Sequence, residues 1–130
     1  MRKILLDTHI FLWMQGFPDR LGPARSIFED PESSLLLSAV SSFEIAVKWA
    51  LGKLVIPDRP DVYVPDRMRL TSLGALPVTH THALAVAELP NLHRDPFDRL
   101  LIAQARVENI ELATADERFR DYPVNLMWIG

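Results

Sequence analysis

Residues 1–13 read MRKILLDTHIFLW, an apolar run that stops at an acid and then continues into a second apolar stretch. The run Arg2–Leu6 is too short for a helix, so it predicts a strand that is buried on both faces of a sheet. Because Asp7 interrupts this run at once, the segment does not fit a signal peptide. Asp7 and Thr8 can begin a helix, which we expect over Ile10–Gln15.

The same alternation of strand and helix continues along the chain. Short apolar runs predict four more strands, over Leu35–Leu37, Leu76–Thr79, Ile110–Thr114 and Val124–Ile129. Helices are predicted over Pro23–Asp30, Ser41–Leu51 (ended by Gly52), Asp66–Leu73, His82–Leu89 and Pro96–Glu108, with a helical turn over Asp116–Phe119. Three prolines predict a loop over Val55–Pro65. This order predicts an α/β fold, a mainly parallel sheet flanked by helices, whose sites form at the carboxyl ends of the strands.

Length and composition narrow the possibilities. The 130 residues fit a single domain over 1–130, since two domains would have about 65 residues each. No cysteine is present, which excludes a disulfide scaffold, a thiolate zinc site and a cysteine nucleophile, and fits a cytoplasmic protein. The net charge of −3 excludes an obvious polycation. No segment reaches the roughly 18 apolar residues that a membrane span needs, so no membrane association is expected.

Four acids are predicted to reach one edge of the molecule. Asp7 directly follows the first strand, and Asp116 follows the fourth. Glu44 and Asp98 lie in the first turns of two predicted helices. Four carboxylates that converge without matching cations would repel one another, and hard oxygen ligands of this kind suit Mg²⁺ or Mn²⁺. The pattern therefore indicates a carboxylate metal site.

Helix capping is an alternative explanation for each acid alone. Asp95 has the position of an N-cap, and Asp98 lies three residues later, where the helix dipole favours an acid. Asp7 and Asp116 have positions that suit N-caps as well. The metal site depends on the topology that brings the four acids together.

Other groups of residues have structural explanations too. Ser41 and Glu44 have the spacing of a capping box, and Glu44 and Lys48 that of a surface ion pair. His80 and His82 resemble half of a zinc site, but three or four convergent ligands are needed, which favours polar residues at a helix start.

Four segments of the chain each contain one of the four acids. They are Met1–Trp13, Ser38–Leu54 (SAVSSFEIAVKWALGKL), His93–Ala105 (HRDPFDRLLIAQA) and Ala113–Asp116 (ATAD). Together they resemble the acidic motifs of PIN domains, and most closely those of VapC-like ribonuclease toxins of bacterial toxin–antitoxin modules. The resemblance covers essentially the whole chain, and DPFDRLLIAQA is its most specific run. The fourth motif departs slightly, since Ala115 stands where family members often have Asn or Arg.

The resemblance implies a three-layer PIN-like fold and a metal-dependent ribonuclease. It matches Asp7, Glu44, Asp98 and Asp116 to the four family acids and leaves Asp95 as the helix cap. We expect Asp7 and Asp98 to be direct ligands of Mg²⁺ or Mn²⁺, and the other two acids to hold a second metal or orient its water.

The partners that the resemblance implies are an RNA substrate, a cognate antitoxin and a second copy of the chain in a homodimer. Arg94 and Arg99 flank the third motif and could pair with the acids or contact RNA phosphate. The alternatives are a PIN-fold RNA-processing or DNA-directed nuclease outside such a module, and a non-catalytic binding or receiver-like module. A receiver is disfavoured because the last lysine is Lys53.

Overall fold

A computed structural model describes residues 2–130 and contains one five-stranded sheet in the order β3-β2-β1-β4-β5. Every neighbouring pair of strands is parallel. The strands are β1 (Lys3–Leu6), β2 (Ser34–Ser38), β3 (Gly74–Leu76), β4 (Glu111–Thr114) and β5 (Leu126–Trp128). The predicted parallel α/β fold is therefore confirmed.

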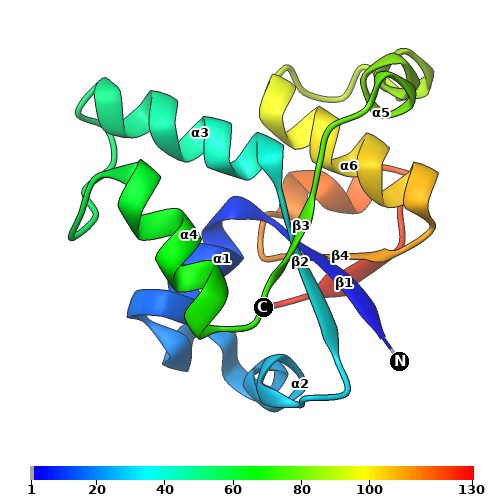
Figure 1. Cartoon of the computed structure of the whole chain (residues 1–130). Helices are drawn as coiled ribbons and strands as arrows, with labels where there is room; N and C mark the ends of the chain where they lie inside the picture. Colours follow the sequence, from blue (N-terminus) through cyan, green and yellow to red (C-terminus); the bar gives the residue numbers. More distant parts are fainter. Residues whose placement is uncertain (1) are drawn as a thin grey trace.

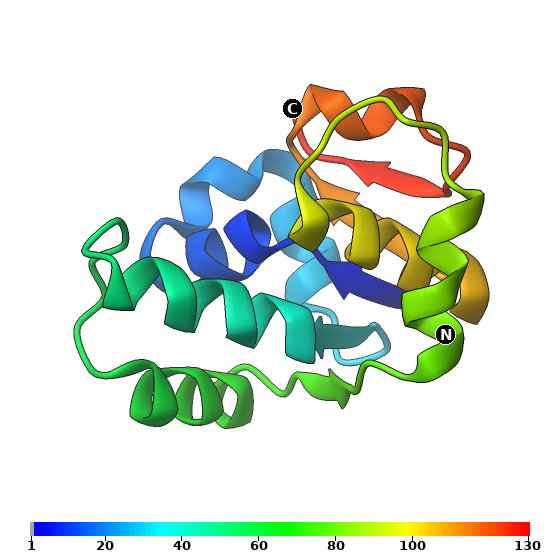
Figure 2. The ribbon, with the colours of Figure 1, turned by 90° about the horizontal axis from the view of Figure 1, so that it is seen from above.

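Helices cover both faces of this sheet, as Figure 1 shows, and the view in Figure 2 places α3 beside α4 and α6 beside α5. The α-helices are α1 (Thr8–Gly16), α2 (Arg25–Glu29), α3 (Ala39–Ala50), α4 (Pro60–Leu70), α5 (His80–Ala85) and α6 (Pro96–Glu108). Short 3₁₀ segments are η1 (Pro18–Ala24), η2 (Val86–Glu88) and η3 (Glu117–Asp121). Between residues 2 and 130, no helix is both long and apolar enough to span a membrane.

Alternate residues of the strands divide the core into two layers. Ile4 and Leu6 of β1 pack with α1, α2 and α4 on one face of the sheet. Leu5 lies between them in sequence and packs with α6 and η3 on the other face. This alternation follows from the two-residue period of a strand and explains why β1 is apolar throughout. The central strand is thus held rigidly from both sides, and Asp7 is fixed directly at its end.

The predicted loop over Val55–Pro65 is wrong in its second half, because α4 begins at Pro60. Proline fits the first position of a helix, where its missing N–H has no helical partner. Pro65 lies inside α4 and gives up one helical hydrogen bond. Burial of Val64 against the first core layer favours the helix despite that loss.

Other boundaries shift by a few residues. The third strand pairs over Gly74–Leu76 and not over Leu76–Thr79, because Pro77 has no N–H for a further ladder bond. Helix α5 begins at His80, with Thr79 as its N-cap, two residues earlier than expected. By contrast, α6 matches its predicted range, and Gly52 follows α3 with a φ of 71° that favours glycine.

Candidate active site

The candidate site lies where the strand order reverses direction. The central strand β1 has β2 on one side and β4 on the other, so the chain leaves β1 towards one half of the sheet and later returns to the other half. In open α/β sheets, ligand sites form at such a point, beyond the carboxyl ends of the strands. Asp7 follows β1, Asp116 follows β4, and α3 begins directly after β2.

Asp7 is 3% exposed and does not use its side chain as a helix cap. Its backbone carbonyl accepts the first bonds of α1, while its carboxylate Oδ2 accepts a 2.8 Å hydrogen bond from the Thr114 hydroxyl. The side-chain N-cap considered for Asp7 is therefore wrong. Burial raises the pKa of Asp7, and the Thr114 hydrogen bond partly opposes that rise.

Glu44 is also 3% exposed, and the capping-box interpretation is wrong for it. The N-cap of α3 is Ser38, whose side chain accepts a hydrogen bond from the Val40 N–H, so Glu44 lies well inside the helix. Thr8 Oγ1 donates to Glu44 Oε1 at 2.7 Å, and Lys48 Nζ donates to Oε2. Because the Glu44 carboxylate is buried, its pair with Lys48 is not an ordinary surface pair.

Asp95 and Asp98 have different roles although they share the start of α6. Asp95 is the N-cap, as predicted, because its Oδ1 accepts hydrogen bonds from the N–H groups of Phe97 and Asp98. Asp98 is 6% exposed, and burial and the nearby charge of Asp7 raise its pKa to about 8. A helix-dipole residue gains by being ionised, whereas the site around Asp98 opposes ionisation.

Asp116 is less buried and is held by an arginine that the sequence analysis did not single out. Its Oδ1 accepts a bond from the Arg118 N–H, which confirms the N-cap position. The Arg118 guanidinium also binds Asp116, with Nη2 2.7 Å from Oδ2, and lies 3.6 Å from Asp98 Oδ2. This contact holds the pKa of Asp116 below its usual range.

Three residues that contact the four acids were not predicted: Thr8, Thr114 and Arg118. Thr8 orients Glu44, and Thr114 orients Asp7 across the β1–β4 pair. Arg118 had one signal, its position two residues after Asp116. Arg99, by contrast, donates to the carbonyls of Pro90 and Val86 and to the Tyr122 hydroxyl, so it fixes the loop before α6 and pairs with none of the four acids. Arg94 is exposed.

The donor set suits a hard divalent cation. Three carboxylates are nearly buried. Burial first, and then the nearby charges of Asp7, Asp95 and Glu44, raise the pKa of Asp98, so these acids repel one another across the site. Within residues 2–130, however, no three acidic or histidine side chains already have the spacing of ligands around one metal ion. Two of the four carboxylates form ion pairs instead, Glu44 with Lys48 and Asp116 with Arg118.

The two imidazoles that resembled half of a zinc site do not converge. His80 is exposed, whereas His82 is buried at the start of α5. His82 Nε2 lies 2.7 Å from Glu108 Oε2, and its Nδ1 accepts from the Thr79 N–H in a capping box. Both histidines are thus polar residues at a helix start, as expected.

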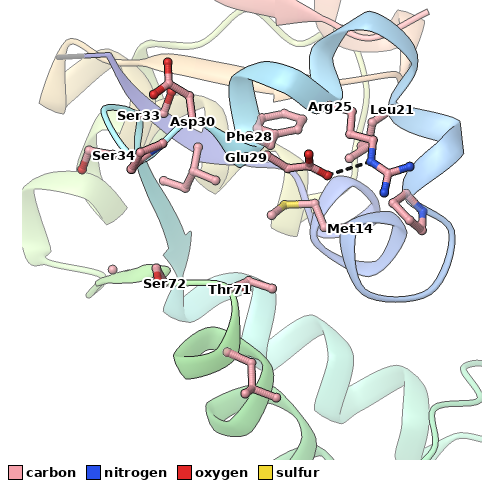
Figure 3. Close-up of a pocket in the computed structure, with 15 residues that line it drawn as sticks. Met14, Leu21, Arg25, Phe28, Glu29, Asp30, Ser33, Ser34, Thr71 and Ser72 are labelled. Carbon is pink, nitrogen blue, oxygen red and sulfur yellow. Dashed lines mark hydrogen bonds and ion pairs between the residues drawn. The ribbon is translucent and has the colours of Figure 1, made fainter.

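A cavity of about 640 Å³ lies at the opposite, amino-terminal edge of the sheet. Figure 3 shows that it lies between Phe28 and Leu21 on one side and Thr71 and Ser72 on the other. Its charged residue Arg25 already pairs with Glu29. A second cavity of about 600 Å³ is mostly apolar and is lined by α1, the segment after α3, and α4. None of the four acids lines either cavity.

Comparison with known proteins places this geometry in a family. Residues 4–125 match the PIN domain. The chain belongs to the PIN domain family. A Mycobacterium tuberculosis protein named Ribonuclease VapC22 is 31% identical over 127 residues, which cover 94% of this chain and 93% of that protein. Ribonuclease VapC16 from the same organism is 45% identical over 64 residues, 49% of this chain, and that match spans only 45% of the relative's length.

Solved structures with this fold include a toxin–antitoxin complex from Klebsiella pneumoniae, which superposes with a TM-score of 0.63 at 17% identity and covers 92% of each chain. VapBC2 from Rickettsia felis, bound to a promoter DNA fragment, has a chain that superposes with a TM-score of 0.72 at 17% identity, covering 98% of this chain and 99% of that one. FitAB bound to a DNA fragment gives a TM-score of 0.66 at 21% identity, covering 95% and 93%. At these identities the likeness shows the fold, a three-layer PIN arrangement.

Proposed function

We propose that this PIN domain, over residues 1–130, is an endoribonuclease of a toxin–antitoxin module that needs a divalent metal, Mg²⁺ or its substitute Mn²⁺. The observation that carries the proposal is the burial of Asp7, Glu44 and Asp98 at the sheet's reversal point, where burial and the nearby acids, Asp7 foremost, oppose ionisation of Asp98. A group of buried carboxylates with this mutual repulsion is expected to bind a cation. The relatives named as ribonucleases support RNA as the substrate.

The four acids are proposed to have different roles at the metal site. Asp7 and Asp98 are proposed as direct ligands, and Glu44 and Asp116 as ligands of a second ion or as groups that orient water. A divalent ion bound there would lower the pKa of bound water and neutralise charge on the phosphate. Thr114 and Thr8 keep one oxygen each of Asp7 and Glu44 in place.

The first test measures cleavage of RNA by purified protein with Mg²⁺, with Mn²⁺ and with EDTA. Cleavage is expected with either metal and is expected to disappear with EDTA and in Asp98→Asn. Asp95→Asn is the matched control, since asparagine also caps helices and the same charge is lost three residues away. Cleavage by the parent that survives EDTA, or cleavage by Asp98→Asn at the parent's rate with metal, would contradict the proposal. A parallel DNA substrate separates this function from that of a DNA-directed nuclease.

The proposed protein partners are a cognate antitoxin and a second copy of the chain. The second cavity presents Trp13, Phe17 and Tyr63 beside Val55 and suits an apolar segment of an antitoxin. Growth that is unaffected by expression without an antitoxin would contradict the toxin assignment.

The homodimer proposal rests on apolar side chains that the single chain leaves uncovered. On α3, Phe43 is 60% exposed and Trp49 is also exposed, so this helix offers surface that the chain does not bury. Phe43 also packs edge-on against Phe97 at the start of α6. Light scattering of parent and Phe43→Asp tests the dimer, and a parent that is monomeric at micromolar concentration would contradict it.

A further inference from the structure

One guanidinium group spans two of the four acids. Arg118 Nη2 lies 2.7 Å from Asp116 Oδ2 and 3.6 Å from Asp98 Oδ2. Arg118 Nε lies 3.1 Å from Asp116 Oδ1 and 3.2 Å from its Oδ2, so the guanidinium contacts both oxygens of that carboxylate in a forked arrangement. The positive charge therefore lies between the side chains that follow β4 and begin α6.

The contact is built into the backbone of η3. The Arg118 N–H donates to Asp116 Oδ1, and Phe119, the next residue, is fully buried in the second core layer. The start of the Arg118 side chain is thus fixed, while the side chain itself is 59% exposed. The guanidinium can turn outward without disturbing the core.

This inference rests on the proposed function. We propose that Arg118 is an intramolecular counter-ion that competes with the divalent metal for Asp98 and Asp116. Without metal, its guanidinium balances part of the negative charge and turns Asp116 towards itself. When metal binds, the same carboxylate oxygens are needed as ligands, so the guanidinium has to leave.

The test compares the Mn²⁺ affinity of the parent with that of two Arg118 variants in the absence of RNA. Binding is measured from the electron paramagnetic resonance signal of free Mn²⁺. Arg118→Gln is expected to bind Mn²⁺ about tenfold more tightly than the parent, because a forked arginine–carboxylate contact is stronger than a single exposed ion pair. Arg118→Lys keeps the charge but loses the fork, and its affinity is expected to lie between the two. Because Arg118 is exposed, both variants are expected to keep the parent's circular dichroism, and the lysine variant gives the answer if the glutamine variant does not fold.

Arg120→Gln is the matched control. It removes the same charge from the same η3 segment, but its guanidinium lies 4.1 Å over the Trp128 ring and not against the acids. Only a weak change, up to about twofold, is expected at physiological salt, where exposed charges are screened within about 8 Å. Equal gains in Arg118→Gln and Arg120→Gln would mean a net-charge effect and would overturn the inference.

The remaining outcomes separate the inference from the proposed function. If the parent binds Mn²⁺ in an Asp98-dependent way and Arg118→Gln binds it equally or more weakly, Arg118 is not a competitor, while the metal site stands. If neither the parent nor Arg118→Gln binds Mn²⁺, the inference and the metal-dependent function both fail. If only Arg118→Gln binds it, the competition is strong and both are supported.

Discussion

Replacing Asp98 by asparagine tests whether Asp98 is a metal ligand or only an acid that the helix dipole favours in the first turn of α6. Asp98 is 6% exposed, and the Arg118 guanidinium lies 3.6 Å from its Oδ2. Its pKa is raised to about 8, first by burial and then by the charge of Asp7. Ionising Asp98 in the metal-free folded protein is therefore unfavourable.

The size of the effect follows from the linkage between pKa and stability. The unfolded chain loses the Asp98 proton near its ordinary pKa of about 4, whereas the folded protein keeps it up to about pH 8. Because the unfolded state binds fewer protons in this window, the free energy of unfolding falls as pH rises, by up to about 1.4 kcal/mol per pH unit. The free energy of unfolding is therefore lowered by about 1.5 kcal/mol at pH 5 and by at most about 4 kcal/mol at pH 7.

Asparagine has nearly the same shape and removes this loss. In EDTA we expect Asp98→Asn to unfold at higher urea concentration than the parent, with a gain of about 2–4 kcal/mol at pH 7 and a smaller gain at pH 5. Part of the calculated maximum is lost because Asp7 shares the repulsion and structure and solvent relax around it. Asp95→Asn, which keeps the helix cap, is expected to give a much smaller gain.

A thermal scan with Mg²⁺ completes the experiment. Mass action raises the melting temperature of a protein that binds metal only when folded, so the parent should be stabilised and Asp98→Asn should not. If Asp98 merely favours the helix dipole, the variant should instead lose a few tenths to about 1 kcal/mol with or without metal. A variant that is less stable in EDTA, yet gains as much from Mg²⁺ as the parent, would refute the reasoning.

Three further predictions concern the groups around the site. Thr114→Val removes the hydroxyl that donates to Asp7, so we expect the free energy of unfolding to fall by about 1–3 kcal/mol and Mn²⁺ binding to weaken. Urea and Mn²⁺ titrations measure both effects, and Thr81→Val, at an exposed position, should change neither. Asp95→Ala removes the cap of α6 and should cost about 1 kcal/mol, measured by urea unfolding, and an unchanged midpoint would show that the cap contributes nothing. Glu108→Gln should raise the apparent hydrogen-exchange rate in α5 by weakening the bond to His82, and unchanged exchange would show that this bond does not hold α5.

The sheet was predictable from the sequence because its strands are short apolar runs between helices. The residues of α6 were also predictable, since Asp95, Pro96 and Asn109 mark both ends of the helix by local chemistry. The start of α4 was not, because Pro60 and Pro65 suggest a loop to any local rule. Burial of Val64 against the rest of the fold outweighs that local preference.

The gathering of the acids was predictable from topology, but their support was not. Thr114 meets Asp7 only because β1 pairs with β4 across 107 positions of sequence. Thr8 meets Glu44 only because α1 packs beside α3. Hydroxyl side chains of this kind are common in any sequence, and only the fold identifies the two that orient a carboxylate.

The burial of the acids argues most directly against a purely structural explanation. A capping carboxylate binds backbone N–H groups of its own helix, as Asp95 does. Asp98 lies in the first turn of the same helix, yet burial and the nearby charge of Asp7 raise its pKa. Stability alone would favour replacing such a residue, because a carboxyl group buried beside another acid destabilises the fold. The arrangement of Asp7, Glu44 and Asp98 is explained if an added positive charge completes it, and this expectation is the one that the Asp98→Asn experiment measures with and without metal.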